Sequence, residues 1–239
     1  MDYLVTMRLA IISDIHSNYP ALTKALSFID RSRIDQIYCL GDIVGYGASP
    51  NECVALVRER AVAAVLGNHD VAALDPSFAE YFTKPGRVAA EWTNRVLTPE
   101  HKTYLQSLPY TVQTELVTFV HAGPFAPGEW EYVQSLPGAE KQFGAFKTQL
   151  CFIGHTHIPM VCGENLKTFI FKKGMRYLIN VGSIGQPRDG NPQLSFGIFD
   201  TELWTYEGIR IDYDIRAAVA AITEAKLPPM LGQRLFEGQ

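Results

Sequence analysis

The stretch Leu9-Ala10-Ile11-Ile12-Ser13-Asp14-Ile15-His16 decides the fold, because an apolar run leads directly into residues that can bind a metal ion. Its first five residues are small or apolar and predict a buried β-strand, and Asp14 and His16 follow the end of that strand. Asn18 and Pro20 then favour a helix start, and apolar residues continue at helical spacing. We therefore expect a strand, a polar loop and a helix in succession.

The same succession returns twice along the first half of the chain. Residues 37–40 lead into Gly41-Asp42, and residues 63–66 lead into Gly67-Asn68. Between these runs, Ser49 predicts a helix cap, with a proline in the first turn and a glutamate three residues on that completes a capping box. Alternating strands and helices of this kind imply parallel strands joined by crossover helices.

The second half of the chain is richer in strands. Residues 75–108 contain no obvious strand and predict two helices, the second capped by Thr98. Strands are then expected at residues 116–120, 150–153, 168–171, 176–179 and 194–199, with a hairpin at residues 172–174. A helix over residues 214–225 and a short polar tail complete the pattern. We predict one domain over residues 1–239, with residues 75–108 as a helical insertion near the active site.

Bulk composition narrows the class of protein. The net charge of -4 over 239 residues argues against a protein that binds nucleic acid through bulk electrostatics. Four cysteines without C-x-x-C spacing give no disulfide framework, which fits a reducing compartment. No apolar stretch reaches the roughly 18 residues that span a bilayer, and no signal peptide is recognised. We expect a cytoplasmic protein without a membrane partner.

Five of the six histidines lie in four short segments beside Asp, Asn or Gly. The segments are Asp14-Ile15-His16, Gly67-Asn68-His69-Asp70, His121-Ala122-Gly123 and Gly154-His155-Thr156-His157. Each segment follows a strand-like run, and the carboxyl ends of strands in an open α/β sheet meet at one edge. Asp, His and Asn suit Mn, Fe, Zn or Ni, and this set is large enough for two ions.

Taken in order, the motifs D-x-H, G-D, G-N-H-D/E, H and G-H-x-H resemble those of the calcineurin-like metallophosphoesterase superfamily. Residues 180–188 resemble the tail of its small prokaryotic phosphodiesterases. The resemblance implies an α/β fold with a two-sheet β-sandwich flanked by helices, in the layer order α/β/β/α. It also implies a dinuclear metal centre at the strand ends and hydrolysis of phosphodiesters by a hydroxide that bridges the two ions.

The resemblance further assigns a role to each motif residue. Asp14, His16 and His157 would hold one ion, Asn68, His121 and His155 would hold the other, and Asp42 would bridge them. Two divalent ions are expected, with Mn first and Ni, Co, Fe or Zn as alternatives. His69 would give a proton to the leaving group, or would make a hydrogen bond that only shapes its loop.

Departures from the family pattern concern the contacts to the substrate. Gly45-Tyr46 stands where serine/threonine protein phosphatases of the superfamily carry Asp-Arg, so that activity is not expected, and the group that orients His69 is open. Arg188 is a candidate phosphate contact or a surface arginine, and Asn18 is a phosphate contact or a helix cap. Trp130 and Tyr132 stack on a nucleobase or belong to the core.

Two other functions stay open at this level. A phosphomonoesterase or nucleotidase would use the same metal core. A non-catalytic scaffold of the same fold would have lost metal ligands or His69, all of which are present. The expected partner is a small phosphoester or nucleotide-like substrate, and the sequence leaves the physiological substrate, the native metal and the oligomeric state undetermined.

Overall fold

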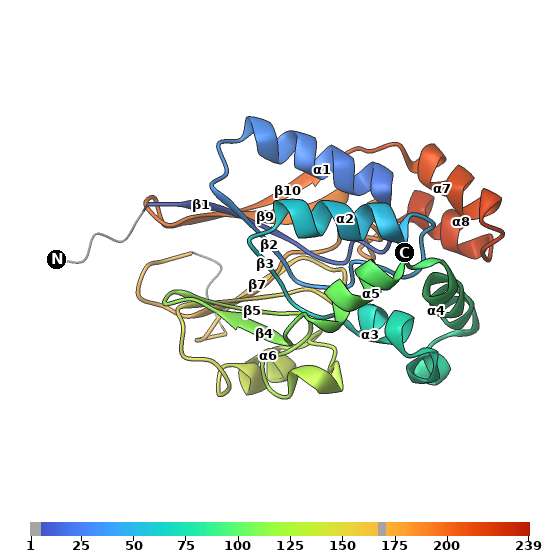
Figure 1. Ribbon diagram of the computed structural model, residues 1–239. Helices are drawn as coiled ribbons and strands as arrows, with labels where there is room; N and C mark the ends of the chain where they lie inside the picture. The colour runs from blue at the N-terminus through green and yellow to red at the C-terminus, as the bar shows by residue number, and fades with distance from the viewer. Residues whose placement is uncertain (1–5, 167–170) are drawn as a thin grey trace.

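The computed structural model describes residues 6–166 and 171–239, and in these residues two β-sheets are stacked face to face (Figure 1). The first sheet has the strand order β10 (Thr205–Ile211), β9 (Leu194–Asp200), β1 (Arg8–Ile12), β2 (Gln36–Cys39) and β3 (Ala63–Ala64). The second has the order β4 (Thr111–Gln113), β5 (Val117–Val120), β6 (Leu150–Ile153), β8 (Tyr177–Asn180) and β7 (Met160–Gly163).

Helices cover the outer faces of both sheets and gather at one end of the molecule. The α-helices are α1 (Tyr19–Arg31), α2 (Pro50–Arg60), α3 (Asn68–Leu74), α4 (Lys84–Val96), α5 (Pro99–Gln106), α6 (Leu136–Gln142), α7 (Ile215–Glu224) and α8 (Met230–Glu237). Two short 3-10 helices are η1 (Pro76–Tyr81) and η2 (Pro127–Glu129). In Figure 1, α1 and α2 lie above the first sheet, α6 lies below the second, and α3, α4, α7 and α8 gather opposite the N-terminus.

The strand directions agree with the crossover pattern expected from the sequence. β1 pairs parallel with β2, and β2 pairs parallel with β3. In the second sheet, β5, β6 and β8 are parallel. Antiparallel strands complete both sheets: β9 and β10 in the first, β4 and β7 in the second. The predicted α/β/β/α sandwich is confirmed.

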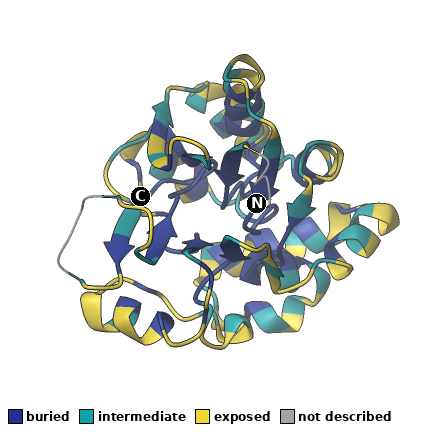
Figure 2. Ribbon diagram, turned by 90° about the vertical axis from the view of Figure 1, so that its left-hand side faces the viewer, coloured by how far each residue is buried: buried dark blue, intermediate teal, exposed yellow. Residues whose placement is uncertain are grey.

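Successive side chains of the central strands point to opposite faces of their sheet, and this divides the core into layers. Leu9 and Ile11 of β1 face the second sheet, where Phe119 and Phe152 also lie. The intervening residues of β1 pack instead against the helices on the outer face. Tyr38 of β2 stacks on Phe119 of β5 with ring centroids 4.1 Å apart, which joins the two sheets directly. Figure 2 shows this buried interior between more exposed helices.

Several local expectations were wrong. Three strands, β4, β7 and β10, were not predicted, and both β4 and β10 carry largely exposed, polar sequences. The expected polar tail contains α8, whose apolar face packs against α7. α2 begins at Pro50 with Ser49 as its N-cap residue, as expected, but the capping box does not form: the Ser49 side chain makes no cap hydrogen bond, and its N–H donates to the carbonyl of Ser17. Most of the strand expected at residues 168–171 lies outside the described residues.

Other local expectations are confirmed. Asn18 caps α1 and Thr98 caps α5, in each case by accepting a backbone N–H three residues on. All four cysteines are buried, and none of them forms a disulfide bond. None of the helices in residues 6–166 and 171–239 is long and apolar enough to cross a membrane.

Candidate metal centre

All seven predicted metal ligands meet at one edge of the sandwich. Each follows a strand end: Asp14 and His16 follow β1, Asp42 follows β2, Asn68 follows β3, His121 follows β5, and His155 and His157 follow β6. All seven side chains are buried. Because parallel strands of both sheets end at this edge, residues up to 143 positions apart in the sequence become neighbours.

The loops that carry these ligands have an unusual backbone. Left-handed φ values occur at Asp14 (52°), His16 (49°), Asp42 (49°), His155 (67°) and His157 (61°). Residues other than glycine seldom adopt this conformation, and such strain gathers at functional sites where the surrounding structure enforces it. The backbone therefore turns sharply at the ends of β1, β2 and β6, where these five residues lie.

One group of ligand atoms surrounds a point between Asp14, His16, Asp42 and His157. Nε2 of His16 lies 3.1 Å from Nε2 of His157. Oδ1 of Asp14 lies 3.2 Å from Nε2 of His157 and 3.8 Å from Nε2 of His16. Two nitrogens and two carboxylates at these separations form a set that borderline divalent metals accept.

A second group lies next to the first and comprises Asp42, His121 and His155, with Asn68 beside them. Nε2 of His121 is 3.1 Å from Oδ1 of Asn68 and 3.2 Å from Nδ1 of His155. Nε2 of His155 is buried and has no hydrogen-bond partner in the described residues. The amide oxygen and two imidazoles therefore converge on one point.

Asp42 belongs to both groups. Its Oδ2 lies 3.6 Å from Nε2 of His16 in the first group and 3.3 Å from Nε2 of His121 in the second. Its other oxygen, Oδ1, accepts a hydrogen bond from the backbone N–H of His69 at 2.8 Å. One oxygen is thus fixed by the backbone, and the other faces both groups.

Hydrogen bonds on the far side of three imidazoles fix which nitrogen can bind a metal. Nδ1 of His16 faces the Val44 carbonyl, and Nδ1 of His121 faces the Leu40 carbonyl. Nδ1 of His157 likewise faces the carbonyl of Gln186. A carbonyl only accepts, so each Nδ1 must carry the proton, and each Nε2 of a neutral ring presents its lone pair to the centre.

This arrangement fits a cation. Burial lowers the pKa values of both His16 and His157, so these rings are neutral near pH 7 and their facing Nε2 atoms both carry lone pairs. Oδ1 of Asp14 is also buried without a hydrogen-bond partner in the part of the chain that is described. Lone pairs that face one another across about 3 Å repel unless a proton or a metal ion lies between them.

The carboxylates stay ionised although they are buried. Burial acts to raise the pKa of Asp14, but the neighbouring histidine rings outweigh it and hold that pKa well below its usual value. Asp42 behaves in the same way, with His121 as its strongest neighbour. Burial lowers the pKa of His121, yet Asp42 prevails and raises it to about 9. In the absence of metal, His121 therefore carries a proton at neutral pH.

Two glycines are required by close contacts at the centre. A Cβ on Gly154 would lie 2.0 Å from Oγ of Ser13 and 2.4 Å from Oδ2 of Asp14. Gly45 has a φ of +96°, and a Cβ there would lie 2.7 Å from Nδ1 of His69. Larger residues at either position would displace a ligand or the His69 ring.

Aromatic rings pack around the side chain of His69. Its ring centroid lies 4.3 Å from that of Tyr46, 4.4 Å from that of Phe82 and 4.8 Å from that of His16. Its buried Nδ1 has no hydrogen-bond partner in the described residues. Burial lowers the pKa of His69 to about 4. Aromatic packing therefore orients His69, and the sequence did not reveal these ring contacts.

Asp70 ties the ligand loops together, a role that the sequence did not indicate. Its buried carboxylate accepts hydrogen bonds from the backbone N–H of Val44 at 3.1 Å and of Gly67 at 3.0 Å. Burial, with Asp42 nearby, raises the pKa of Asp70 to about 7. Asp70 therefore links the loop after β2 to the loop after β3.

The two predicted phosphate contacts lie in different settings. Asn18 accepts from Ala21 N and donates both amide hydrogens, to the Gly185 carbonyl and to the Tyr213 hydroxyl. Its cap role is confirmed, and a phosphate contact would require one of these bonds to break. Arg188 is half-buried beside the centre, and its backbone N–H bonds to the carbonyl of His157.

A cavity of about 420 Å³ opens beside the second group of ligands. Asn68 and His155 line it together with Phe78, Tyr81, Phe82, Trp130 and Tyr132. Tyr132 is 51% exposed and lies 4.1 Å from the His155 ring. The alternative that Trp130 and Tyr132 are core aromatics is wrong, since both line this cavity and neither is buried.

The sequence and the structure were compared with those of known proteins. The family described as "Calcineurin-like phosphoesterase superfamily domain" matches residues 7–203. An uncharacterized protein of Methanocaldococcus jannaschii is 41% identical, and the alignment covers 99% of this chain and 100% of that protein.

Solved structures include two that match over nearly the whole length. A metallophosphoesterase from Sphaerobacter thermophilus superposes with a TM-score of 0.87 at 40% identity, covering 98% of this chain and 100% of that one. A hypothetical protein from Pyrococcus horikoshii has a TM-score of 0.83 at 21% identity over 97% and 98% of the two chains, and so shares the fold. With its motif ligands gathered at the strand ends, the chain belongs to the calcineurin-like phosphoesterase superfamily.

Proposed function

We propose that this protein is a metal-dependent phosphoesterase that hydrolyses phosphodiesters and uses two divalent ions. The observation that carries the proposal is the position of Asp42, whose Oδ2 lies within 3.6 Å of a histidine from each ligand group. A carboxylate oxygen shared in this way is suited to two ions held close together.

Each ion would have its own protein ligands besides Asp42. Asp14, His16 and His157 would hold the first ion, and Asn68, His121 and His155 would hold the second. When bound, such ions supply a Lewis acid for the phosphoryl oxygens and lower the pKa of water toward neutrality. Mn is the first choice, with Ni, Co, Fe or Zn as alternatives, because imidazole nitrogen suits these metals better than Mg.

The protein's own residues set the charge and shape of the centre. Asp14 and Asp42 are the buried carboxylates of the two groups and offset only part of the charge of two divalent ions. The remaining positive charge attracts a phosphate, although the chain as a whole is acidic.

The neighbouring cavity supports a diester as substrate. A diester has two substituents on phosphorus, and the aromatic cavity of about 420 Å³ beside Asn68 and His155 can hold one of them. Trp130 and Tyr132 line it, and aromatic rings suit a planar group such as a nucleobase. The proposed partner is therefore a small phosphoester or nucleotide-like substrate.

His69 is the proposed proton donor to the leaving oxygen. Burial lowers the pKa of its ring to about 4, so the ring is neutral at pH 7. It needs a neighbouring negative charge to hold a proton. A bound phosphodiester supplies that charge and raises the pKa of a nearby imidazole. Tyr46 and Phe82 fix the ring so that it cannot turn away from the centre.

The test is hydrolysis by metal-stripped protein that is refilled with one metal at a time. Bis-p-nitrophenyl phosphate and p-nitrophenyl phosphate are compared at equal concentration, together with a panel of nucleotides. We expect turnover of the diester with Mn and a clearly lower rate on the monoester. A preference for the monoester or for nucleoside monophosphates would replace the proposal by a phosphomonoesterase or nucleotidase.

A pair of matched variants shows whether the metal centre or a contaminating enzyme catalyses the hydrolysis. His121→Ala should abolish turnover, whereas His101→Ala removes a histidine of α5 that is bonded to Asn51, outside every motif, and should leave the rate unchanged. If no substrate is hydrolysed with any of the metals and two ions are bound, the catalytic proposal fails and a scaffold takes its place.

A further inference from the structure

Two arginines from distant parts of the chain lie over the same tyrosine ring. Cζ of Arg188 is 5.8 Å from the centroid of Tyr46, and Cζ of Arg234 on α8 is also 5.8 Å from it. Nη2 of Arg188 donates to the Tyr46 hydroxyl at 3.3 Å. Guanidinium groups are attracted to the face of an aromatic ring, so Tyr46 holds both cations in place.

Both guanidinium groups have donors to spare. Among residues 6–166 and 171–239, Nε of Arg188 is buried without a hydrogen-bond partner, and only Nη2 of its terminal nitrogens is bonded, to Tyr46 and to Oε1 of Gln186. Within the same described residues, Arg234 uses Nε alone, which donates to the main-chain oxygen of Gln239 at 3.1 Å. A planar guanidinium with free terminal N–H groups is the geometry that binds phosphate in a bidentate way.

No aspartate or glutamate in the described residues forms an ion pair with either arginine. The nearest carboxylate in sequence, that of Asp189, is paired with Arg210. Burial lowers the pKa of Arg234, and the positive charge of Arg188 lowers it further. The two positive charges therefore repel one another, and an anion bound to both arginines would offset that repulsion.

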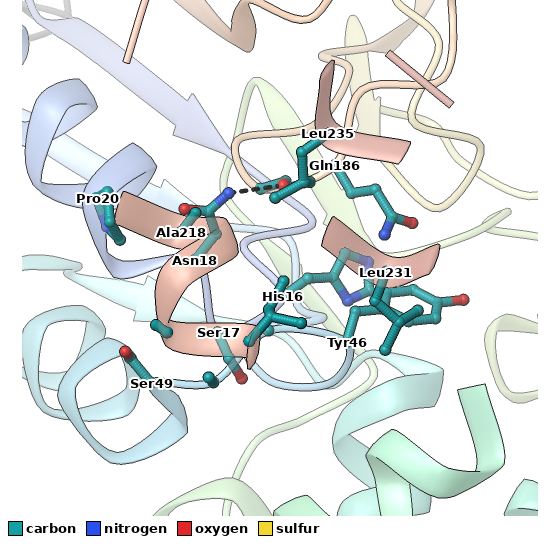
Figure 3. Close-up of a pocket in the computed structure, with 15 residues that line it drawn as sticks. His16, Ser17, Asn18, Pro20, Tyr46, Ser49, Gln186, Ala218, Leu231 and Leu235 are labelled. Carbon is teal, nitrogen blue, oxygen red and sulfur yellow. Dashed lines mark hydrogen bonds between the residues drawn. The ribbon is translucent and has the colours of Figure 1, made fainter. Parts of the chain in front are cut away.

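The pair lies at the edge of the metal centre. The Tyr46 ring is 4.7 Å from that of His16 and 4.3 Å from that of His69. In Figure 3, Leu231 and Leu235 of α8 lie close to Tyr46 and Gln186 around a small cavity, so α8 is seated against the loops of the centre. In the sequence of α8, Arg234 falls between these two leucines.

We infer that Arg188 and Arg234 form a second anion-binding site, which holds a further phosphate group of the substrate next to the phosphate at the metal centre. This inference rests on the proposed phosphoesterase function and narrows its substrate class. A group on this side of the centre would carry its charge toward Tyr46, while the aromatic cavity on the side of His155 accepts the other substituent. The substrate class is an ester of a diphosphate, in which two phosphates are adjacent.

The test compares two chromogenic substrates that differ by one phosphate. The first is the p-nitrophenyl ester of a nucleoside 5′-monophosphate, and the second is the p-nitrophenyl ester on the terminal phosphate of the matching nucleoside diphosphate. Both release p-nitrophenol, so the leaving group is the same. Steady-state constants are measured for the Mn-loaded wild type, Arg234→Ala and Arg234→Lys.

We expect Arg234→Ala to raise KM for the diphosphate ester about tenfold or more, with kcat within about twofold, because a charge-assisted contact to the bound group is lost. KM for the monophosphate ester should stay the same. Arg234→Lys should recover part of the loss, since it restores the charge but not the fork. Arg216→Ala is the matched control, because Arg216 is exposed on the neighbouring helix α7.

An equal rise in KM for both esters would overturn the inference, since Arg234 would then act on the scissile phosphate or on the fold. Unchanged constants for both esters would overturn it as well.

A binding measurement distinguishes failure of this inference from failure of the proposed function. If the wild type hydrolyses neither ester, the phosphoesterase proposal fails. Calorimetric titration of the metal-loaded protein with inorganic pyrophosphate, with metal content checked before and after, still measures the second site. Binding should weaken about tenfold in Arg234→Ala and not in Arg216→Ala. Equal affinity in all three proteins would rule the second site out.

Discussion

Nε2 of His16 lies 3.1 Å from Nε2 of His157, and the opposite nitrogen of each ring is held by a backbone carbonyl. Both facing nitrogens therefore present lone pairs to one another in a buried space. Without a cation this contact is repulsive, so the structure gains stability when a metal ion binds there.

Metal binding should stabilise the folded protein. Ligand binding adds about 2.7 kcal/mol when the free metal is at a hundred times its dissociation constant. Thermal unfolding followed with increasing Mn should show a midpoint that rises by several degrees, and Mg should raise it much less because it prefers oxygen ligands. A midpoint that responds to Mg but not to Mn, Ni or Zn would contradict the nitrogen-rich ligand set.

Asp42→Asn should remove metal and activity together. The amide keeps the size of the carboxylate but lacks the charge that both ligand groups share through Oδ2. We expect metal analysis to show fewer than two ions per chain and turnover of bis-p-nitrophenyl phosphate to fall to background. Circular dichroism should be close to that of the wild type.

Asp30→Asn serves as the control for Asp42, because Asp30 is exposed at the end of α1 and pairs only with Arg60. Its metal content and rate should match the wild type. If Asp42→Asn itself kept two ions and near wild-type activity, Asp42 could not be the bridging ligand.

Metal binding should release a proton at neutral pH. The pKa of His121 is raised to about 9, so in the metal-free protein the ring is charged below that pH, and a metal ion must displace its Nε2 proton. The apparent affinity should therefore increase as pH rises toward about 9 and level off above it, as far as His121 is concerned. Calorimetry of Mn binding at pH 7 in buffers of different ionisation enthalpy measures the number of protons released.

About one proton should be released by His121 at pH 7, and less at pH 10. The variant Asn68→Ala removes a ligand that carries no proton and should weaken binding without reducing the release. A proton count near zero at pH 7 would mean that His121 is neutral before the metal binds.

His69→Ala should keep both ions and lose rate in a way that depends on the leaving group. His69 bonds to Asp42 only through its backbone N–H, which alanine retains. For an alkyl ester, whose departing oxygen needs a proton, the loss should reach roughly 10²–10⁴. For a p-nitrophenyl ester, which leaves as a stable anion, the loss should be much smaller.

Two other outcomes would assign His69 differently. Equal losses on both substrates would favour a positioning role over proton transfer. Loss of metal together with rate would make His69 a support for the ligands. Phe82→Leu tests the packing separately, because it removes a ring 4.4 Å from His69 without touching a metal ligand. It should reduce the rate on the alkyl ester more than the rate on the p-nitrophenyl ester.

Much of the fold follows from local pattern, and the misses have a common cause. Continuous apolar runs such as residues 150–153 are buried on both faces and are visible in the sequence. β10 lies at a sheet edge with mostly polar, half-exposed residues, so its pairing with β9 depends on a neighbour and not on its own pattern. α8 is short and begins after two prolines, and only its packing against α7 reveals it.

The sequence by itself determined the candidate metal ligands, because ligand chemistry depends on residue type and each candidate follows the end of a strand. Tertiary structure alone decided the shared position of Asp42, the ring packing around His69 and the pairing of Arg188 with Arg234. These features join segments that are far apart in the chain. Spacing along the sequence carries no record of such contacts, which arise only when two sheets and a C-terminal helix pack together.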